Sequence, residues 1–494
     1  MNSPGSVAQL SSEGARDVVR DTLFINGAHV AGEGAPLLVE NPATQEPIAT
    51  VAQASPRQID EAVRSAGAAF ASGIWRDAAF RAEVLGRMAD LLSARSAEFA
   101  RSLVAETGTP VSISKFLQLD GPIDMLRYCA SRATVDRTRF LGIDERTPRS
   151  ESMIRYEPAG VAVGIGAYNN PLLYLVSKAC AAMTAGCTAV FMPSSLTPLT
   201  ALLFAEIAEA AGVPPGVLNI LVGGPEAACA LTLHPLVAKI SMTGSVEVGR
   251  KVMAQASDGL KDVVLELGGK SAGIVLPGAD LSRISMPLHG RYLRNAGQGC
   301  QSPTRLLVPH ALFDDFVDAS REAFKHIIVG DPLDAASTSG PLIRESHRAR
   351  VEGFVERARA AGGSLLAGGG RPDMDRGWFM NGALLGGLDN DSEICRSELF
   401  GPVAVAIPYR DVDHAVAIAN DSEFGLAASV FGPLEEARDV AARLHAGTVS
   451  INGGGGFRVD AVLSGWKMSG TGTEWGDDGI AEYLLPQHIQ WALG

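Results

Sequence analysis

The feature that most constrains the fold is the alternation of short apolar runs with helical segments between residues 160 and 267. The apolar runs have the length and composition of buried strands, and Ala-rich stretches of helical length separate them. They lie at residues 160–166 (GVAVGIG), 189–192 (AVFM), 218–222 (LNILV), 239–242 (KISM) and 262–267. Strands that alternate with helices in this way form βαβ units. We therefore predict a doubly wound α/β domain around a parallel sheet.

A second alternating region extends from Ser271 to about Val449, so the sequence predicts two α/β domains that meet near residues 266–270. A chain of 494 residues is also too long for a single hydrophobic core. Helices are expected in and before the first region at residues 56–72, 81–106, from the turn at 169–171 to 185, 200–211 and 226–233.

Composition and charge exclude several classes of protein. The net charge is −13 and acidic and basic residues are interspersed, which argues against a nucleic-acid partner. No apolar run is long enough to span a bilayer, and residues 1–21 lack the basic and apolar regions of a signal peptide, so we expect a cytoplasmic protein with no membrane partner. The six cysteines show neither a C-x-x-C pair nor metal-ligand spacing, so we expect reduced thiols and no metal site. They are Cys129, Cys180, Cys187, Cys229, Cys300 and Cys395.

Cys300 is the cysteine with the most reactive surroundings. It lies in NAGQGCQSPTR (295–305), where its neighbours are small and polar rather than an apolar stripe. This sequence places the thiol on a turn or at a helix start, and a helix N-terminus would lower its pKa and favour the thiolate. The alternative is a cysteine that packs as a small buried apolar residue, which suits Cys180, Cys187 and Cys229 better.

Two polar residues follow predicted strands and could serve such a nucleophile. Glu266 ends an apolar strand before Gly-Gly, where a carboxylate can point into the ligand crevice and act as a general base. Asn169 follows the first strand, and its amide could stabilise an oxyanion. The alternative for Glu266 is a solvated acid at a strand end, and the alternative for Asn169 is a simple turn residue before Pro171.

A phosphate site is expected at Gly244 and Ser245, which follow a strand and open a helix. The dinucleotide fingerprint G-x-G-x-x-G is absent there. Glycines at 160, 164 and 166 stand in a comparable strand position but at the wrong spacing, so the sequence does not predict a standard Rossmann motif.

Six motifs together resemble the aldehyde dehydrogenase superfamily, and the resemblance covers the chain from about Leu23. They occur in the family's order, and 34 positions separate Glu266 from Cys300. The motifs are SMTGSVEVGR (241–250), ELGGK (266–270), GQGC (297–300), ELFGPV (398–403), FGLAASVF (424–431) and GWKMSG (465–470). The resemblance implies an NAD(P)-dependent enzyme that oxidises an aldehyde to a carboxylic acid.

The resemblance also implies a role for each catalytic position. Cys300 would attack the aldehyde, and the Asn169 amide and the Cys300 backbone N–H would hold the oxyanion of the thiohemiacetal. After hydride transfer, Glu266 would activate the water that releases the acid from the thioester. Lys178 and Glu474 match positions of a proton path behind this base.

The cofactor positions follow in the same way, with Gly244 and Ser245 at the pyrophosphate and Glu398 and Phe400 at the nicotinamide ribose and ring. The full set is Ile165, Ala167, Met192, Ser195, Gly224, Gly244, Ser245, Leu267, Gly268, Glu398 and Phe400. Met192 and Ser195 depart from the family's usual lysine and glutamate. Losing the glutamate removes repulsion of a 2′-phosphate, whereas losing the lysine removes the charge that would hold it. We therefore expect NAD as the preferred cofactor and NADP as an alternative.

The expected substrate tunnel also departs from the family pattern, because Tyr168, Asn170 and Ser177 replace aromatic residues and glycines occupy 453–456. This composition favours a roomy, partly apolar tunnel for a branched, aromatic or terpenoid aldehyde. The candidate substrate residues are Asn170, Tyr174, Ser177, Gln301, Phe457 and Leu463.

The resemblance further implies a domain organisation, with two doubly wound α/β domains and a small β arm for oligomerisation. A flexible N-terminal arm would span residues 1–22. The cofactor domain would comprise 23–136 and 156–265, the catalytic domain 266–475, and the arm 137–155 and 476–494. Family members that assemble through such an arm are dimers or tetramers, so a homodimer or homotetramer is expected.

Three other functions compete with this interpretation. A CoA-acylating aldehyde dehydrogenase would typically lack the base, yet Glu266 is present. A non-catalytic binding protein on the same scaffold would be expected to lose the thiol or the base. A thiol hydrolase would need a histidine partner for Cys300, and neither His289 nor His310 lies in a motif for that role.

Overall fold

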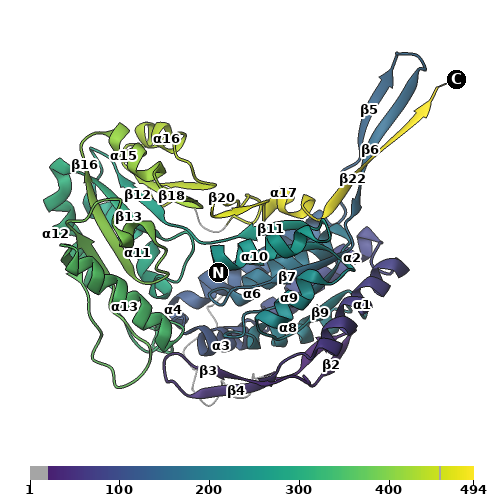
Figure 1. Cartoon of the computed structure of the whole chain (residues 1–494), viewed down its shortest axis with the longest axis horizontal. Helices are drawn as coiled ribbons and strands as arrows, with labels where there is room; N and C mark the ends of the chain where they lie inside the picture. The colour runs from purple at the N-terminus through teal and green to yellow at the C-terminus, as the bar shows by residue number, and fades with distance from the viewer. Residues whose placement is uncertain (1–19, 455–457, 494) are drawn as a thin grey trace, which may run out of the picture.

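The structure is a computed structural model that describes residues 20–454 and 458–493, and it contains two α/β halves side by side with a projecting β arm (Figure 1). Most of the predicted N-terminal arm therefore lies outside the described residues.

The first half is built on an eight-stranded sheet with the order β2-β1-β9-β8-β7-β10-β11-β21. Its central strands are parallel, and the strand order reverses between β7 and β10, as a doubly wound sheet requires. The predicted fold class is thus confirmed. The strands are β1 (Leu23–Ile25), β2 (Ala28–Val30), β7 (Val161–Ile165), β8 (Thr188–Met192), β9 (Leu218–Ile220), β10 (Val237–Thr243), β11 (Asp262–Glu266) and β21 (Gly470–Thr471).

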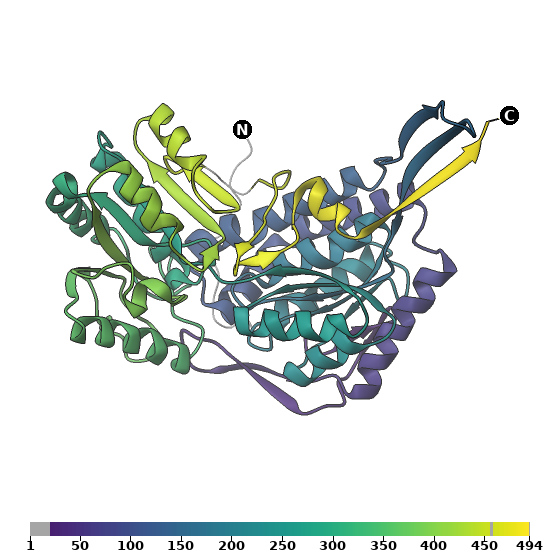
Figure 2. The ribbon, with the colours of Figure 1, turned by 45° about the horizontal axis from the view of Figure 1, so that its top comes forward.

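Helices cover both faces of this sheet (Figures 1 and 2). They are α1 (Pro56–Ser72), α2 (Ala78–Ala94), α3 (Ser96–Thr107), α4 (Val111–Ser114), α5 (Gly121–Arg132), α6 (Pro171–Leu175), α7 (Ala181–Ala185), α8 (Leu199–Ala210), α9 (Pro225–Leu233) and α10 (Val246–Ser257). Two π-helical segments, η2 (Lys115–Asp120) and η3 (Val176–Cys180), interrupt this series.

Two of the predicted helices were wrong as single elements. The stretch 81–106 is split because Arg95 leaves the helical conformation (φ −97°, ψ 16°) between α2 and α3. The helix expected to reach residue 185 widens into η3, and such wide turns are frequent at functional sites. Gly164 on β7 makes room for η3, since a Cβ there would lie 3.0 Å from Lys178 Cβ.

The second half contains a seven-stranded sheet in the order β14-β15-β16-β13-β12-β18-β19, parallel except at β14. Its strands are β12 (Ser271–Val275), β13 (Pro303–Pro309), β14 (Ser364–Gly368), β15 (Ala383–Gly386), β16 (Val403–Tyr409), β18 (Ala427–Phe431) and β19 (Thr448–Ile451). Its helices are α11 (Leu281–Leu293), α12 (Phe313–Phe324), α13 (Glu345–Ala360), α14 (Glu393–Arg396), α15 (Val412–Asn420) and α16 (Leu434–Ala441), with short 3₁₀ turns η4 (Arg294–Gly297) and η5 (His310–Leu312).

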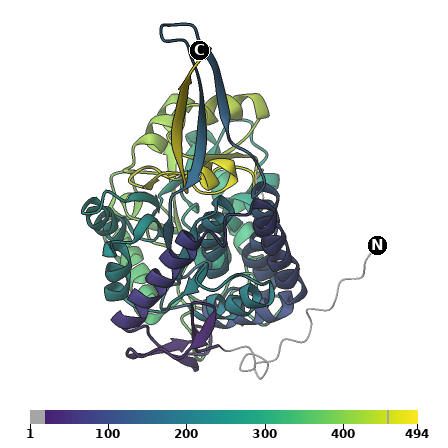
Figure 3. The ribbon, with the colours of Figure 1, turned by 90° about the vertical axis from the view of Figure 1, so that its right-hand side faces the viewer.

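The arm is a three-stranded antiparallel sheet that extends away from both halves (Figures 1 and 3). It consists of β5 (Arg139–Asp144), β6 (Ser150–Pro158) and the C-terminal β22 (Leu484–Ala492), with β6 in the middle. Two further pairs complete the described sheets, β3 (Pro36–Glu40) with β4 (Pro47–Ala52) and β17 (Phe424–Gly425) with β20 (Trp466–Lys467).

The chain passes from one half to the other twice, and both crossings lie close together. Residues 266–270 lead from β11 to β12, and the C-terminal segment returns to the first sheet when β21 pairs with β11. This return lies within the range predicted for the catalytic domain, and it precedes α17 (Gly476–Ala481). It places the C-terminal segment beside Glu266, which pairs with Gly470. No helix in the described part of the chain is long and apolar enough to cross a membrane.

Candidate active site

The thiol of Cys300 lies where the two halves meet. Cys300 is partly buried in the turn between η4 and β13, against the crossing segment 266–270. A Cβ on Gly269 would lie 2.5 Å from the carbonyl oxygen of Cys300, so only glycine permits this approach of the two backbones.

The turn that precedes the thiol is left-handed over three residues. Asn295, Ala296 and Gly297 have φ values of 52°, 51° and 70°. Such conformations are costly for residues other than glycine and persist where the surroundings hold them. Here the buried amide of Gln298 does so, donating to the carbonyls of Asn295 and Pro341 at 3.1 and 3.2 Å.

Cys300 lies on a turn, one of the two placements that the sequence predicted, and the helix start that would have lowered its pKa is absent at this residue. Burial, with smaller contributions from the nearby carboxyls of Glu398 and Glu266, raises the pKa of the Cys300 thiol to about 12, while the backbone N–H groups of Cys300 and Gln301 oppose the shift. The free thiol is therefore held neutral at pH 7, and its activation depends on a base and not on a helix dipole.

The side-chain amide of Asn169 is oriented from both ends. Its Nδ2 donates to the backbone carbonyl of Gln298 at 3.0 Å, and the Tyr174 hydroxyl donates to its Oδ1 at 2.9 Å. Gln118 Nε2 donates to the Asn169 carbonyl at 2.8 Å. One Nδ2 hydrogen of this buried amide is thus committed to Gln298, and the other is left for an oxyanion.

Glu266 is buried at the carboxyl end of β11, with 4% of its surface exposed. Its Oε1 accepts no hydrogen bond from the described residues. Burial, together with repulsion by Glu474, raises the pKa of Glu266 to about 9, while Lys178 and the backbone of Gly465 oppose the shift. A buried carboxylate with an unsatisfied oxygen and a raised pKa is suited to taking a proton from water.

A buried ion pair lies behind Glu266. The ammonium of Lys178, on η3, contacts Glu474 Oε1 and donates to Ser241 Oγ at 3.1 Å, and Ser241 Oγ lies 2.8 Å from the same carboxylate oxygen. Ser177 Oγ is 3.4 Å from Glu474 Oε2. Ser241 is not among the predicted site residues, although a serine in a buried, largely apolar strand indicates a polar partner nearby.

The carboxyl ends of four parallel strands form the edge where the cofactor residues were predicted. Ile165 is in register with Met242 on one side and with Met192 on the other, and Thr243 is in register with Glu266. Three predicted positions follow these strands directly, Ala167 after β7, Ser195 after β8 and Leu267 after β11. Gly224 is the N-cap residue of α9.

Gly244 and Ser245 lie between β10 and α10 as predicted from the sequence pattern. Ser245 is the N-cap of α10, and its Oγ accepts from the Val248 N–H at 3.3 Å. A Cβ on Gly244 would meet Met242 Cε at 2.5 Å, so this loop lies tightly on the strand end. The exposed N-terminus of α10 offers backbone N–H groups and a positive dipole to an anion.

Glu398 faces the crossing segment from the catalytic half. Its Oε1 accepts from the Gly269 N–H at 3.0 Å, and a Cβ on Gly268 would lie 2.2 Å from its Oε2. Burial raises the pKa of Glu398 to about 7. Phe400, two residues later, has a left-handed backbone (φ 58°), and His347 Nε2 is 2.7 Å from its carbonyl oxygen.

Two buried polar atoms at this edge indicate a ligand. The Tyr168 hydroxyl and Thr243 Oγ1 have no hydrogen-bond partner among the described residues. The Tyr168 ring packs edge-on to Phe400 with centroids 5.7 Å apart. Because buried polar groups are normally paired, these residues fit a polar cofactor along the edge.

The predicted substrate residues divide into those near the thiol and those drawn into other contacts. Gln301 follows Cys300 and is partly buried, and Asn170 is the N-cap residue of α6. Tyr174 was expected to be an apolar wall, but its hydroxyl is bonded to Asn169. Ser177 contacts Glu474, and Leu463 pairs with Glu474 through backbone bonds of 2.8 Å. Phe457 lies outside the described residues.

Neither histidine considered as a partner for the thiol reaches it. His289 is buried among Tyr292 and Ser320, to which its nitrogens lie at 2.8 and 2.9 Å, and burial lowers its pKa to about 3. His310 begins η5, at the end of β13 opposite to Cys300. The geometry disfavours a histidine-activated hydrolase.

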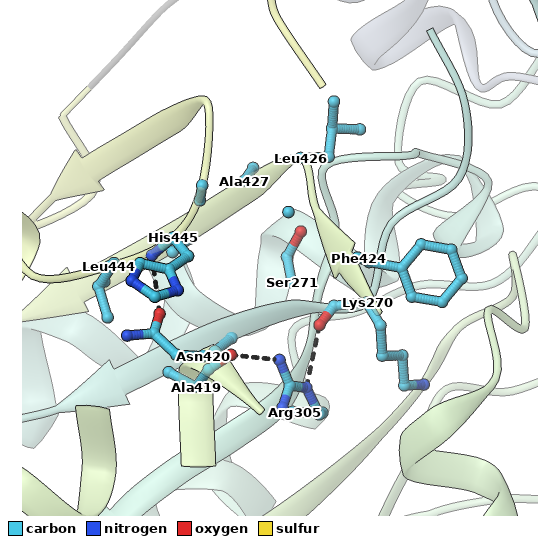
Figure 4. Close-up of a pocket in the computed structure, with 14 residues that line it drawn as sticks. Lys270, Ser271, Arg305, Ala419, Asn420, Phe424, Leu426, Ala427, Leu444 and His445 are labelled. Atoms are coloured by element: carbon cyan, nitrogen blue, oxygen red, sulfur yellow. Dashed lines mark hydrogen bonds between the residues drawn. The ribbon is translucent and has the colours of Figure 1, made fainter. Parts of the chain in front are cut away.

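A separate pocket lies at the amino ends of β12, β13 and β18 (Figure 4). The Arg305 guanidinium fills one side of it and donates to the carbonyls of Lys270 and Ala419 at 3.0 and 2.9 Å. None of the predicted site residues lines this pocket, and Arg305 serves to tie the strand ends together.

Comparisons with known proteins agree with this arrangement. A family model described as the aldehyde dehydrogenase family matches residues 29–489. The chain is 37% identical to a geranial dehydrogenase from Castellaniella defragrans over 470 residues, which cover 93% of this chain and 96% of that protein. It is 36% identical to a mitochondrial aldehyde dehydrogenase from Mesocricetus auratus, with 94% of each chain covered.

Solved structures with the same fold include two cofactor complexes. Aldehyde dehydrogenase C of Pseudomonas syringae, a mutant in complex with NAD⁺ and octanal, has a TM-score of 0.90 at 35% identity and covers 97% of this chain and 98% of its own. Betaine aldehyde dehydrogenase of Staphylococcus aureus with NAD⁺ has a TM-score of 0.93 at 32% identity, with 97% of each chain covered. The chain therefore belongs to the aldehyde dehydrogenase family.

Proposed function

We propose that this protein oxidises an aldehyde to the carboxylic acid through a thioester on Cys300, with NAD as the first choice of cofactor. The observation that carries the proposal is the convergence of a thiol, an oriented amide and a buried carboxyl at the edge of the first sheet. These are Cys300, Asn169 and Glu266.

In the first step the Cys300 thiol gives its proton to a water molecule, and the sulfur attacks the aldehyde carbon. The free Nδ2 hydrogen of Asn169 and the Cys300 backbone N–H stabilise the oxyanion of the thiohemiacetal, because they are donors fixed in a buried site. A bound nicotinamide supplies the hydride acceptor that converts this adduct to a thioester.

The second step is hydrolysis. Glu266 takes a proton from water, which attacks the thioester and releases the acid. The Lys178–Glu474 pair tunes the charge on Glu266, because the two groups shift its pKa in opposite directions. Both members of the pair also bond to Ser241. We propose that this buried chain exchanges the proton after each turnover.

For the cofactor, Gly244 and Ser245 would receive the pyrophosphate at the N-terminus of α10, and Glu398 and Phe400 would flank the nicotinamide riboside. The loop after β8 carries no charge at Met192 or Ser195. It therefore neither repels nor attracts a 2′-phosphate strongly, which favours NAD while permitting NADP. The NAD⁺ complexes of the related enzymes support this order.

For the substrate, we propose a large apolar aldehyde. Two exposed apolar residues of η2, Phe116 and Leu117, support this because the same segment carries Gln118, which contacts Asn169. The names of two relatives point the same way, one a geranial dehydrogenase and the other bound to octanal. The hydroxyls of Tyr174 and Ser177 contact Asn169 and Glu474 and add polar groups beside the expected tunnel.

The decisive experiment follows reduced nicotinamide after mixing the protein with NAD or NADP and a panel of aldehydes in the absence of CoA. We expect the largest kcat/KM for long or terpenoid aldehydes. Equal values for acetaldehyde would contradict the substrate class. Activity that requires CoA would favour the acylating alternative, and the absence of product with any aldehyde, with or without CoA, would favour a binding protein.

A further inference from the structure

The segment that links α3 to η2 makes buried polar contacts with three parts of the site. Glu106, at the end of α3, accepts from the backbone N–H groups of Leu199 and Thr200 at 2.7 and 3.0 Å, which begin α8 after the cofactor loop. Gln118 supports the backbone of Asn169. Thr109 lies between these two and reaches the catalytic half.

The Thr109 hydroxyl donates to the side-chain carbonyl of Asn295 at 2.7 Å. Thr109 has no exposed surface and Asn295 is 6% exposed, so water cannot replace this donor. Asn295 is the first residue of the left-handed turn before the thiol, and its Nδ2 is 3.4 Å from the Gln298 carbonyl oxygen. That same carbonyl accepts from Asn169.

We propose that Thr109 is a positioning residue, which fixes the turn that carries the Cys300 nucleophile through the side chain of Asn295. Without its donor, the buried side-chain carbonyl of Asn295 would be left unsatisfied, and one support of three consecutive left-handed residues would be lost. The backbone N–H groups of Cys300 and Gln301 face the sulfur and favour the thiolate, so a displaced turn would weaken both contacts. The inference deepens the proposed function, on which the catalytic meaning of Cys300 rests.

The test is the rate at which iodoacetamide alkylates Cys300 in the cofactor-free protein at one fixed pH below the thiol pKa, read by peptide mass spectrometry. For Thr109→Val, which keeps the shape and removes the hydroxyl, we expect a rate about tenfold lower, because small displacements of a reacting group cost one to two orders of magnitude. Thr109→Ser keeps the hydroxyl and should react like the unmodified protein. The partly exposed Cys229 is an internal reference whose rate should not change.

Thr188→Val is the matched control, because Thr188 is also fully buried and donates to a backbone carbonyl, that of Ala66, at 2.9 Å away from the turn. It should leave alkylation of Cys300 unchanged. Asn295→Gly removes the same hydrogen bond from the other side while tolerating the left-handed backbone, and its effect should not add to that of Thr109→Val. This variant also decides the question if Thr109→Val does not fold.

An unchanged or faster alkylation of Cys300 in Thr109→Val would overturn the proposal, since a loosened structure alone exposes the thiol. The assay uses neither cofactor nor aldehyde. A protein that oxidises no aldehyde would therefore contradict the proposed function, while the alkylation rates would still decide the role of Thr109.

Discussion

At the scale of single residues, the site depends on groups whose protonation is set by burial. Cys300 and Glu266 both have raised pKa values, and each carboxylate near the thiol makes the thiolate less favourable. The two residues therefore divide the reaction, one forming the thioester and the other hydrolysing it, and each can be tested alone.

Replacing Cys300 with alanine should lower the rate of NADH formation by at least about a thousandfold, because the covalent intermediate cannot form. Binding of NAD, measured by quenching of protein fluorescence, should persist. Cys229→Ala is the control and should retain full turnover. Substantial turnover by Cys300→Ala would exclude the thioester mechanism.

Glu266→Gln should slow thioester hydrolysis while leaving hydride transfer intact, so a burst of NADH equal to the enzyme concentration should precede a slow steady state. In the unmodified protein the base acts only when it has lost its proton. Since the pKa of Glu266 is raised to about 9, kcat should increase as the pH rises toward 9. It should be low at pH values well below 9, where Glu266 is protonated. A pH-independent kcat between pH 6 and 9, with hydrolysis limiting, would remove Glu266 from this role.

At the scale of elements, we propose that the loop between β8 and α8 sets the preference between NAD and NADP. Ser195 is partly exposed on it and bears no charge. Ser195→Glu should raise the KM for NADP by about tenfold, because a carboxylate repels a 2′-phosphate, while kcat with NAD should change little. The ratio of kcat/KM for the two cofactors, measured with one aldehyde, provides the comparison. An unchanged ratio would place the adenosine ribose elsewhere.

At the scale of the whole molecule, the arm presents exposed apolar side chains on an open sheet edge. Phe140, Leu141 and Ile143 on β5 are 68%, 51% and 51% exposed, and β5 is an edge strand. Exposed apolar side chains on an open edge mark an association surface. We propose that a second copy of this chain covers it.

Phe140→Glu combined with Ile143→Glu should shift the protein to a smaller species in sedimentation velocity, because charges would be buried at the contact. Leu38→Glu is the control, since Leu38 is 57% exposed on β3, away from the arm, and should leave the oligomer intact. Identical sedimentation of all three proteins would show that the arm does not hold copies together.

The sequence by itself determined the fold class, because the alternation of apolar strands and helices records how each strand is buried on both faces. It also singled out Cys300, Glu266 and Asn169, since small polar neighbours and strand ends mark positions where side chains face a crevice. It predicted continuous helices over 81–106 and up to residue 185, which the structure interrupts at Arg95 and at η3. Neither interruption is marked by Gly or Pro in the sequence.

Only the tertiary structure decided how these residues are tuned. It brought the hydroxyls of Tyr174 and Ser177 into contact with Asn169 and Glu474, and it joined Thr109 to Asn295 across 186 positions of sequence. It also reversed the expected activation of Cys300, because burial and two carboxyls outweigh its backbone N–H groups. Desolvation and hydrogen-bond partners depend on which distant segments pack together, and no local pattern encodes them.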